Sequence, residues 1–103
     1  TGNAFLYQQK NADIEFYTNN AIRGRLDLDG RLIVGTATSS NAHANADDLI
    51  VGNVPASGES RGITIVTGTD ANGAIHFSDG TSSGSANIIG QIVYEHSNNA
   101  FVF

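Results

Sequence analysis

The chain has 103 residues, a formal net charge of −5 and no cysteine, which is enough length for one small domain or one segment of a longer repetitive chain. Its acidic balance argues against nucleic acid or an anionic membrane as a partner, since both attract basic surfaces, and no apolar run is long enough for membrane insertion. Because neither disulfides nor a zinc-binding pattern support so small a core, we expect self-association to supply the missing support.

The first 35 residues predict strands joined by tight turns. Apolar and polar residues alternate in most of these segments, as they do in strands with one face in a core. The predicted strands are residues 3–9, 13–18, 21–28 and 31–35. The turns between them are Lys10-Asn11, Asn19-Asn20 and Asp29-Gly30, and Asn-Asn and Asp-Gly are residue pairs that suit a hairpin connection.

An irregular stretch, residues 36–47, comes next. Its alanines favour a turn of helix, but Asn and Ser compete for the backbone and the stretch has no amphipathic period, so we expect a surface loop. Residues 48–52 (DLIVG) then repeat residues 31–35 (RLIVG) seventeen positions later. The predicted organisation is one β-rich segment, 1–103, in which the loop joins sub-units 1–35 and 48–103.

The second half of the sequence predicts a central hairpin and a final one. Residues 62–67 and 74–79 alternate with period two around the turn residues 70–73. The remaining predicted elements are a proline-containing loop at 53–60, a Gly/Ser-rich link at 81–86, a strand at 87–96, a turn at 97–99 and a strand at 100–103. The predicted fold class is all-β, built from short antiparallel strands and hairpins whose edges need partners.

Both ends of the sequence carry the same five-residue pattern. Residues 3–7 (NAFLY) match residues 99–103 (NAFVF), so the chain is expected to close on the beginning of its own next repeat. Such an arrangement suits an extended array or a fibre. The first residue is not Met and the last lies in an apolar run, so we expect a piece of a longer chain or a processed product.

Two ordered phrases resemble the shaft proteins of tail fibres and tail spikes of tailed bacteriophages, marine ones in particular. They are DIEFYTNNAIRGRLDLDGRLIVGTAT and RGITIVTGTDANGAIHFSDGTS…GQIVYEHSNNAFVF. The resemblance implies an intertwined or side-by-side homotrimeric fibre segment, in the virion or otherwise extracellular, which supports host-cell attachment without enzymatic activity or a cofactor. In that family such shafts often precede a self-cleaving chaperone domain, which nothing in this sequence resembles.

Three side chains suggest a metal site. His76, Asp79 and His96 would meet if the last hairpin packed against the central one. No close pair of ligands stands at zinc spacing, however. We therefore prefer the interpretation that the histidines lie on polar strand faces and bond to neighbours or water, and we expect no bound metal.

The three tyrosines, Tyr7, Tyr17 and Tyr94, are candidates for glycan or subunit contact. Aromatic rings stack on sugars, but aromatic residues are also enriched at protein interfaces, and we prefer subunit contact. One alternative function is a carbohydrate-binding, lectin-like module that recognises a host surface glycan. Another is a self-assembling extracellular filament, in which the NAFLY and NAFVF ends make a head-to-tail contact.

Basic residues cluster on the hairpin predicted from strands 21–28 and 31–35. The three basic residues there are Arg23, Arg25 and Arg31, and the acids expected to pair with them across strands are Asp13, Glu15 and Asp27. Such pairs help to fix strand register. The segment 27–30 (DLDG) is similar to part of a calcium loop, but it lacks the further ligands and the closing Glu, so a hairpin turn is the better interpretation.

Overall fold

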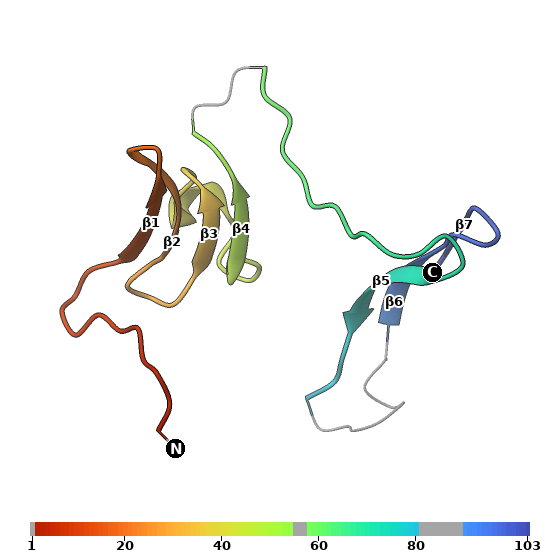
Figure 1. Cartoon of the computed structure of the whole chain (residues 1–103), viewed down its shortest axis with the longest axis horizontal. Helices are drawn as coiled ribbons and strands as arrows, with labels where there is room; N and C mark the ends of the chain where they lie inside the picture. Colours follow the sequence, from red (N-terminus) through yellow and green to blue (C-terminus); the bar gives the residue numbers. More distant parts are fainter. Residues whose placement is uncertain (1, 55–57, 81–89) are drawn as a thin grey trace. The chain divides into compact units, whose positions relative to one another are not determined.

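The computed structural model describes residues 2–54, 58–80 and 90–103. In these residues the chain forms seven strands, arranged in two sheets, and one short 3-10 helix (Figure 1). It divides into two compact units, Thr1–Ile63 and Thr64–Phe103, and each unit contains one sheet. The all-β prediction is confirmed. Within the same residues, no helix has the length and apolar character that crossing a bilayer requires.

The sheet of the first unit has four strands in chain order. They are β1 (Ile14–Thr18), β2 (Ala21–Leu26), β3 (Leu32–Gly35) and β4 (Leu49–Gly52). The turn between β1 and β2 holds Asn19 and Asn20 at positive φ, as a two-residue hairpin turn requires. The β2–β3 turn has Gly30 at positive φ. Both predicted hairpins are therefore present.

The strands β3 and β4 pair in parallel, whereas the predicted strands were antiparallel. Their register places each residue of the first LIVG beside its counterpart in the second, from Leu32 beside Leu49 to Gly35 beside Gly52. A parallel pair needs a crossover of about a dozen residues. Residues 36–48 supply it and include the 3-10 helix η1 (Ser39–Asn41). The predicted loop 36–47 thus connects two strands of one sheet, and the boundary between the two compact units follows Ile63.

The core of the first unit lies on one face of this sheet. Ile33 and Ile50, opposite each other in β3 and β4, are buried there together with Ala37 of the crossover, and Ala42 packs against them. Arg25 holds the crossover in place, because its guanidinium donates a 2.5 Å hydrogen bond to the carbonyl oxygen of Ala37. The crossover loop is therefore the cover of this core.

The sheet of the second unit has three antiparallel strands. They are β5 (Asn72–Phe77), β6 (Gly90–Glu95) and β7 (Ala100–Val102), in that order. The turn from β6 to β7 places Asn99 at positive φ, and the Asn98 side chain donates a 2.8 Å hydrogen bond to Glu95. This turn and its flanking strands agree with the prediction for the end of the chain.

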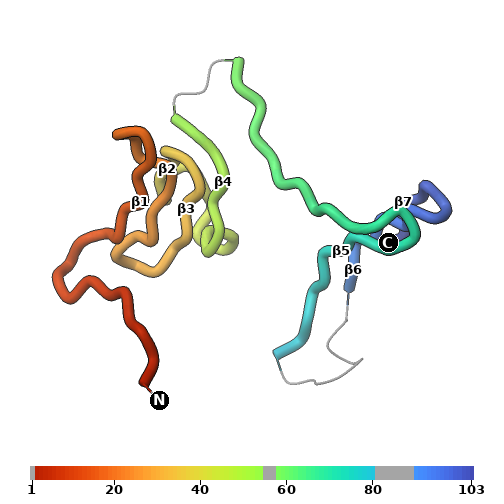
Figure 2. Tube along the Cα trace, in the orientation of Figure 1, coloured from red at the N-terminus to blue at the C-terminus, as the bar shows by residue number. Residues whose placement is uncertain are grey.

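Two predicted strands are wrong. Residues 3–9 form no strand, and neither do residues 62–67, so the predicted central hairpin is absent (Figure 1). Figure 2 shows the path of both segments, which carry no strand label. β5 pairs instead with β6, which offers it six consecutive partners. Residues of the expected partner segment still lie beside β5, because a Cβ on Gly73 would stand 3.4 Å from Cγ2 of Ile65. The predicted link 81–86 and the first part of the predicted strand 87–96 lie outside the described residues, as do residues 55–57 of the predicted loop 53–60.

Candidate subunit interface

One face of the first sheet carries two rows of side chains that cross all four strands. The first row is Ile14, Leu26, Leu32 and Leu49, and the second is Phe16, Gly24, Val34 and Val51. Directly opposed residues on paired strands project from the same face of a sheet. All members except Gly24 are apolar and large. We call this surface the first open face.

The first open face is not covered as the opposite face is. Val34 is 50% exposed and Leu49 53%, whereas Ile33, the neighbour of Val34 in β3, is 1% exposed. Single exposed apolar side chains are ordinary on soluble proteins, but a contiguous set marks an interaction surface. The first unit therefore has one covered apolar face and one apolar face that remains half-exposed.

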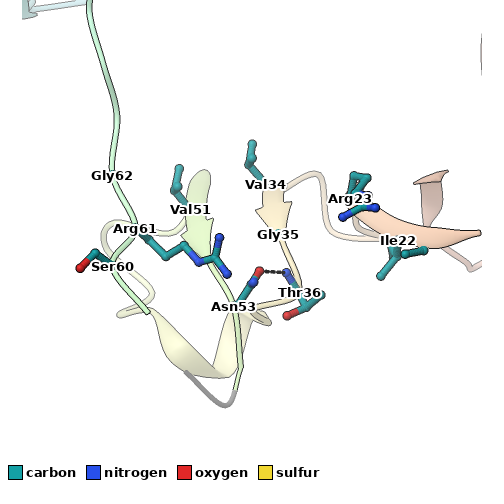
Figure 3. A pocket seen from close by; sticks show the side chains of 11 residues that line it. Ile22, Arg23, Val34, Gly35, Thr36, Val51, Asn53, Ser60, Arg61 and Gly62 are labelled. Atoms are coloured by element: carbon teal, nitrogen blue, oxygen red, sulfur yellow. Dashed lines mark hydrogen bonds between the residues drawn. The ribbon is translucent and has the colours of Figure 1, made fainter. Parts of the chain in front are cut away.

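A hollow lies at one end of the first open face. It has a volume of about 550 Å³ and is bordered by Val34 and Val51 on one side and by residues 60–62 on the other. Figure 3 shows the side chains of Val34 and Val51 projecting in the same direction from neighbouring strands, beside the 3.0 Å hydrogen bond from the N–H of Thr36 to Asn53. The lining of the hollow is mixed, because Thr36, Asn53 and two arginines border it together with the two valines.

The two arginines that line this hollow do not make it an anion site. Arg61 forms an ion pair with Glu59, and Nε of Arg23 donates a 3.0 Å hydrogen bond to the hydroxyl of Thr18. Each side chain is thus engaged with a neighbour on its own segment or the adjacent strand. The hollow is better explained as the margin of the open face than as a ligand pocket.

The second sheet also has one face that collects its large apolar side chains. Its cross-strand rows contain Gly73, Tyr94 and Phe101, then Ile75 and Ile92, then Phe77 and Gly90. The rings of Tyr94 and Phe101 meet edge to face at a centroid distance of 5.0 Å, and Phe101 stacks on Phe103 at 6.2 Å. Phe101 and Phe103 remain largely exposed. We call this surface the second open face.

The three candidate tyrosines lie in different surroundings. Tyr7 is in the segment before β1 and is exposed, as is Tyr17 of β1, whose hydroxyl donates a 2.8 Å hydrogen bond to Glu15. That contact raises the pKa of the Tyr17 hydroxyl, through the hydrogen bond first and the negative charge of Glu15 second. Tyr94 belongs to the second unit, where its ring is part of the second open face. Only Tyr94 is thus tied to an apolar surface by direct ring contacts.

The three candidate metal ligands are not brought together. His76 lies opposite Gln91 in the β5–β6 pair, whereas His96 follows the last paired residue of β6 at the other end of the hairpin. Five register positions separate them, or roughly 16 Å along the strands. The ring of His96 contacts Tyr94 edge to face at 4.9 Å. Among the residues that the structure describes, no group of three or more His, Cys, Asp or Glu side chains is arranged to hold a metal ion.

Arg31 is the centre of an ion-pair network that locks the β2–β3 turn to the crossover loop. Its guanidinium lies 3.2 Å from Asp27, 3.1 Å from Asp29 and 2.7 Å from Asp47, which lies two residues before β4. The carboxylate of Asp27 also accepts hydrogen bonds from the N–H groups of Asp29 and Arg31. The DLDG segment is therefore a hairpin turn with a cation already supplied by the chain.

Some expected ion pairs form and others do not. Asp27 pairs with Arg31 as predicted, and Asp13 lies 3.7 Å from Arg25. Glu15, opposite Arg25 in the strand register, is bonded to Tyr17. Asp47 is a further partner that no local pattern predicts, because only the parallel crossover brings it beside Arg31.

Replacement of Asp27 by asparagine tests this network through pH. Partial burial acts to raise the pKa of Asp27, but hydrogen bonds from the N–H of Arg31, its guanidinium and the N–H of Asp29 outweigh burial and lower the pKa below its ordinary 3.8. A carboxylate with a lowered pKa stabilises the fold above its ordinary pKa and loses that contribution as the pH falls through the folded-state value. We expect Asp27→Asn to be less stable than the parent at about pH 7, with a gap that closes below about pH 4.

The measurement is the urea midpoint of both proteins across this pH range. Asp29→Asn is the matched control, because Asp29 touches the same guanidinium from an exposed position. We expect it to change the midpoint less than Asp27→Asn does. A gap for Asp27→Asn that stays constant between neutral and acidic pH would show that the asparagine acts through packing rather than charge.

Comparisons of the chain with protein-family models, with curated proteins and with solved structures find no match. The function must therefore be inferred from the residues of this chain. The most extensive feature of the described surface that bears on function is the pair of open faces, one on each sheet.

Proposed function

We propose that this chain is a non-enzymatic structural segment of a tail-fibre or tail-spike shaft of a tailed bacteriophage, assembled as a homotrimer and serving host-cell attachment. The supporting observation is that each sheet has one face on which cross-strand rows of large apolar side chains remain about half-exposed. The two phrases described above, which resemble such shafts, support the phage assignment and the number of chains. The location that follows is the virion or another extracellular setting.

The energetics favour assembly over a lone chain. Full burial of a Leu, Val or Phe side chain is worth about 1.5–3 kcal/mol, so completing the burial of half-exposed ones gives on the order of 1 kcal/mol each. The first open face has five such exposed side chains, namely Phe16, Leu26, Leu32, Val34 and Leu49. The second has a similar set. Together the two faces give on the order of 10 kcal/mol, which is comparable with the roughly 4–15 kcal/mol that association costs in lost freedom.

The native mass of the protein, measured by light scattering over a dilution series, tests the proposal. We expect a mass of three chains that does not change with concentration. A mass that grows with concentration would instead favour the self-assembling filament. A stable monomer would overturn the proposal and favour the carbohydrate-binding module. Glycan binding would then be measured for the parent and for Tyr7→Ala and Tyr17→Ala, the variants of the two exposed tyrosines.

A pair of valine variants locates the contact. Val34 and Val54 are almost equally exposed, at 50% and 47%, but only Val34 belongs to a cross-strand row of the first open face. We expect Val34→Glu to reduce the mass to that of smaller species, because the buried carboxylate has no partner, and Val54→Glu to leave it unchanged. Far-UV circular dichroism checks that both variants keep their strands. Equal effects of the two would exclude the first open face as the contact.

A further inference from the structure

The segment before β1 has the composition of a strand but no strand partner. Residues 3–7 (NAFLY) are apolar and aromatic, yet residues 2–9 form no strand, and Phe5, Leu6 and Tyr7 are 67–78% exposed. Residues 2–9 also include no charged side chain. An uncharged, β-prone segment of this kind gains backbone hydrogen bonds and buries its side chains when it joins a sheet edge.

The same pattern does form a strand elsewhere in the chain. Residues 99–103 (NAFVF) contain β7, which pairs with β6 so that Phe101 lies opposite Tyr94 and Val102 opposite Val93. One face of the pair is thus aromatic, and the other carries the two valines together with Glu95 and Ala100. The NAF-aliphatic-aromatic pattern is therefore suited to pair with a strand in which an aromatic residue and a valine are adjacent.

β7 itself presents such a strand. It is at the edge of its sheet, and the order β5-β6-β7 leaves its outer side without a partner among the described residues. Residues 100–103 contain neither a charged residue nor a proline. Charged residues and prolines are the usual means by which an edge strand is kept from pairing with another chain. Phe101 and Val102 of β7, like Tyr94 and Val93 of β6, place an aromatic residue on one face of the sheet and a valine on the other.

We propose that residues 3–7 of one copy of the chain add as an antiparallel strand to the free edge of β7 in a second copy. The matching register places Tyr7 opposite Phe101, Leu6 opposite Val102 and Phe5 opposite Phe103. The aromatic row from Tyr94 to Phe101 then continues into Tyr7, while Leu6 extends the row of Val93 and Val102 on the other face. A shift of residues 3–7 by one position along β7 would put aromatic side chains opposite valine.

This contact joins two different surfaces, so each copy both donates a segment and accepts one. Three copies related by a three-fold axis close such a heterologous contact into a ring, whereas an unclosed contact gives a filament. The inference rests on the proposed self-assembly of the chain and identifies the strand exchange within it. It assigns the exposed aromatic residues of the first segment to a partner of the same sequence.

Disulfide trapping tests the register directly, because the chain has no cysteine of its own. Directly opposite residues of antiparallel strands have Cα atoms about 4.5–5.5 Å apart, within the range that a disulfide spans. Two single-cysteine variants are refolded together from denaturant and oxidised, and linked pairs of chains are counted on a non-reducing gel. Each variant oxidised alone is the control for links between identical positions.

We expect links in the mixture of Leu6→Cys with Val102→Cys and in that of Tyr7→Cys with Phe101→Cys. The swapped mixtures, Leu6→Cys with Phe101→Cys and Tyr7→Cys with Val102→Cys, are expected to link at least about tenfold less, because each joins side chains on opposite faces of the sheet. Equal linking in all four mixtures would overturn the proposed register and indicate random collision.

Two further outcomes separate this inference from the proposed function. Three-chain particles without specific links would overturn the strand exchange and leave the structural function standing. Links that form within a chain carrying both Leu6→Cys and Val102→Cys, but not between chains, would show that the segment closes its own sheet. A monomer by light scattering would overturn both proposals.

Discussion

Replacing Gly35 by alanine is expected to destabilise the first unit by roughly 2–4 kcal/mol. Gly35 ends β3 at a φ of +111°, where an L side chain is strained, and an added Cβ would overlap the carbonyl oxygen of Gly52 and lie 2.7 Å from Oδ1 of Asn53. That carbonyl accepts hydrogen bonds from the N–H groups of Thr36 and Ala37. The chain therefore has to separate the ends of β3 and β4 to admit a methyl group.

The measurement is the urea midpoint of the parent and variant by far-UV circular dichroism. Gly30→Ala is the matched control, because Gly30 has a φ of +90° but no atom within 4 Å of an added Cβ. It is expected to cost only the backbone strain, about 1 kcal/mol. If both variants lost the same stability, the close approach of the two strands would not be the reason for glycine at position 35.

Replacing Ile33 by alanine is expected to cost roughly 2–5 kcal/mol, the range for a buried aliphatic side chain in a packed core. Ile33 is 1% exposed and is the one large side chain in the described part of the molecule that is buried to this degree. It lies between Ile50 and Ala37, and neither can fill the space that three lost carbons leave. Because the core of this unit is so small, the loss is a large share of its stability.

Val34→Ala separates core stability from assembly. Val34 is the next residue of the same strand but projects into the first open face. In dilute, dissociated protein its replacement is expected to change the unfolding midpoint little, since the side chain is half-exposed. In assembled protein it should weaken association. An Ile33→Ala variant that unfolds at the same urea concentration as Val34→Ala, under dissociating conditions, would contradict the assignment of the core to the crossover face.

The hairpins of the first sheet and the final hairpin follow from local chemistry. Alternating side chains identify β1 and β2, and Asn19 and Asn20 adopt the positive φ that their short polar side chains tolerate. Asn99 does the same at the β6–β7 turn. Each of these elements depends on residues within a few positions of one another, so sequence reasoning predicted them.

The two false strands have a different origin. Residues 3–9 and 62–67 have the composition of strands, but a strand exists only where another backbone supplies its hydrogen bonds. β5 pairs with β6, which begins more than a dozen residues after β5 ends, and not with the nearby residues 62–67. Composition indicates that a segment can pair, whereas competition among all available edges decides whether it does.

The candidate sites show the same division. His76 and His96 are close in the predicted hairpin arrangement and five register positions apart in the observed one. Conversely, Asp47 and Arg31 are sixteen residues apart in the chain and form the shortest contact of the Arg31 network. No local pattern marks Asp47 as a partner of Arg31, although the repeated LIVG begins one residue after Arg31 and two residues after Asp47.

The sequence by itself determined the all-β class, the positions of three tight turns and the alternation that makes one face of each sheet apolar, because these depend on neighbouring residues. Only the tertiary structure decided that the repeated LIVG segments pair in parallel and which apolar rows remain open. A crossover long enough to return the chain to the start of β3, so that β4 runs in the same direction, covers the face with Ile33 and Ile50 and leaves the face with Val34 exposed. That choice depends on contacts between residues distant in the chain, which no local pattern encodes.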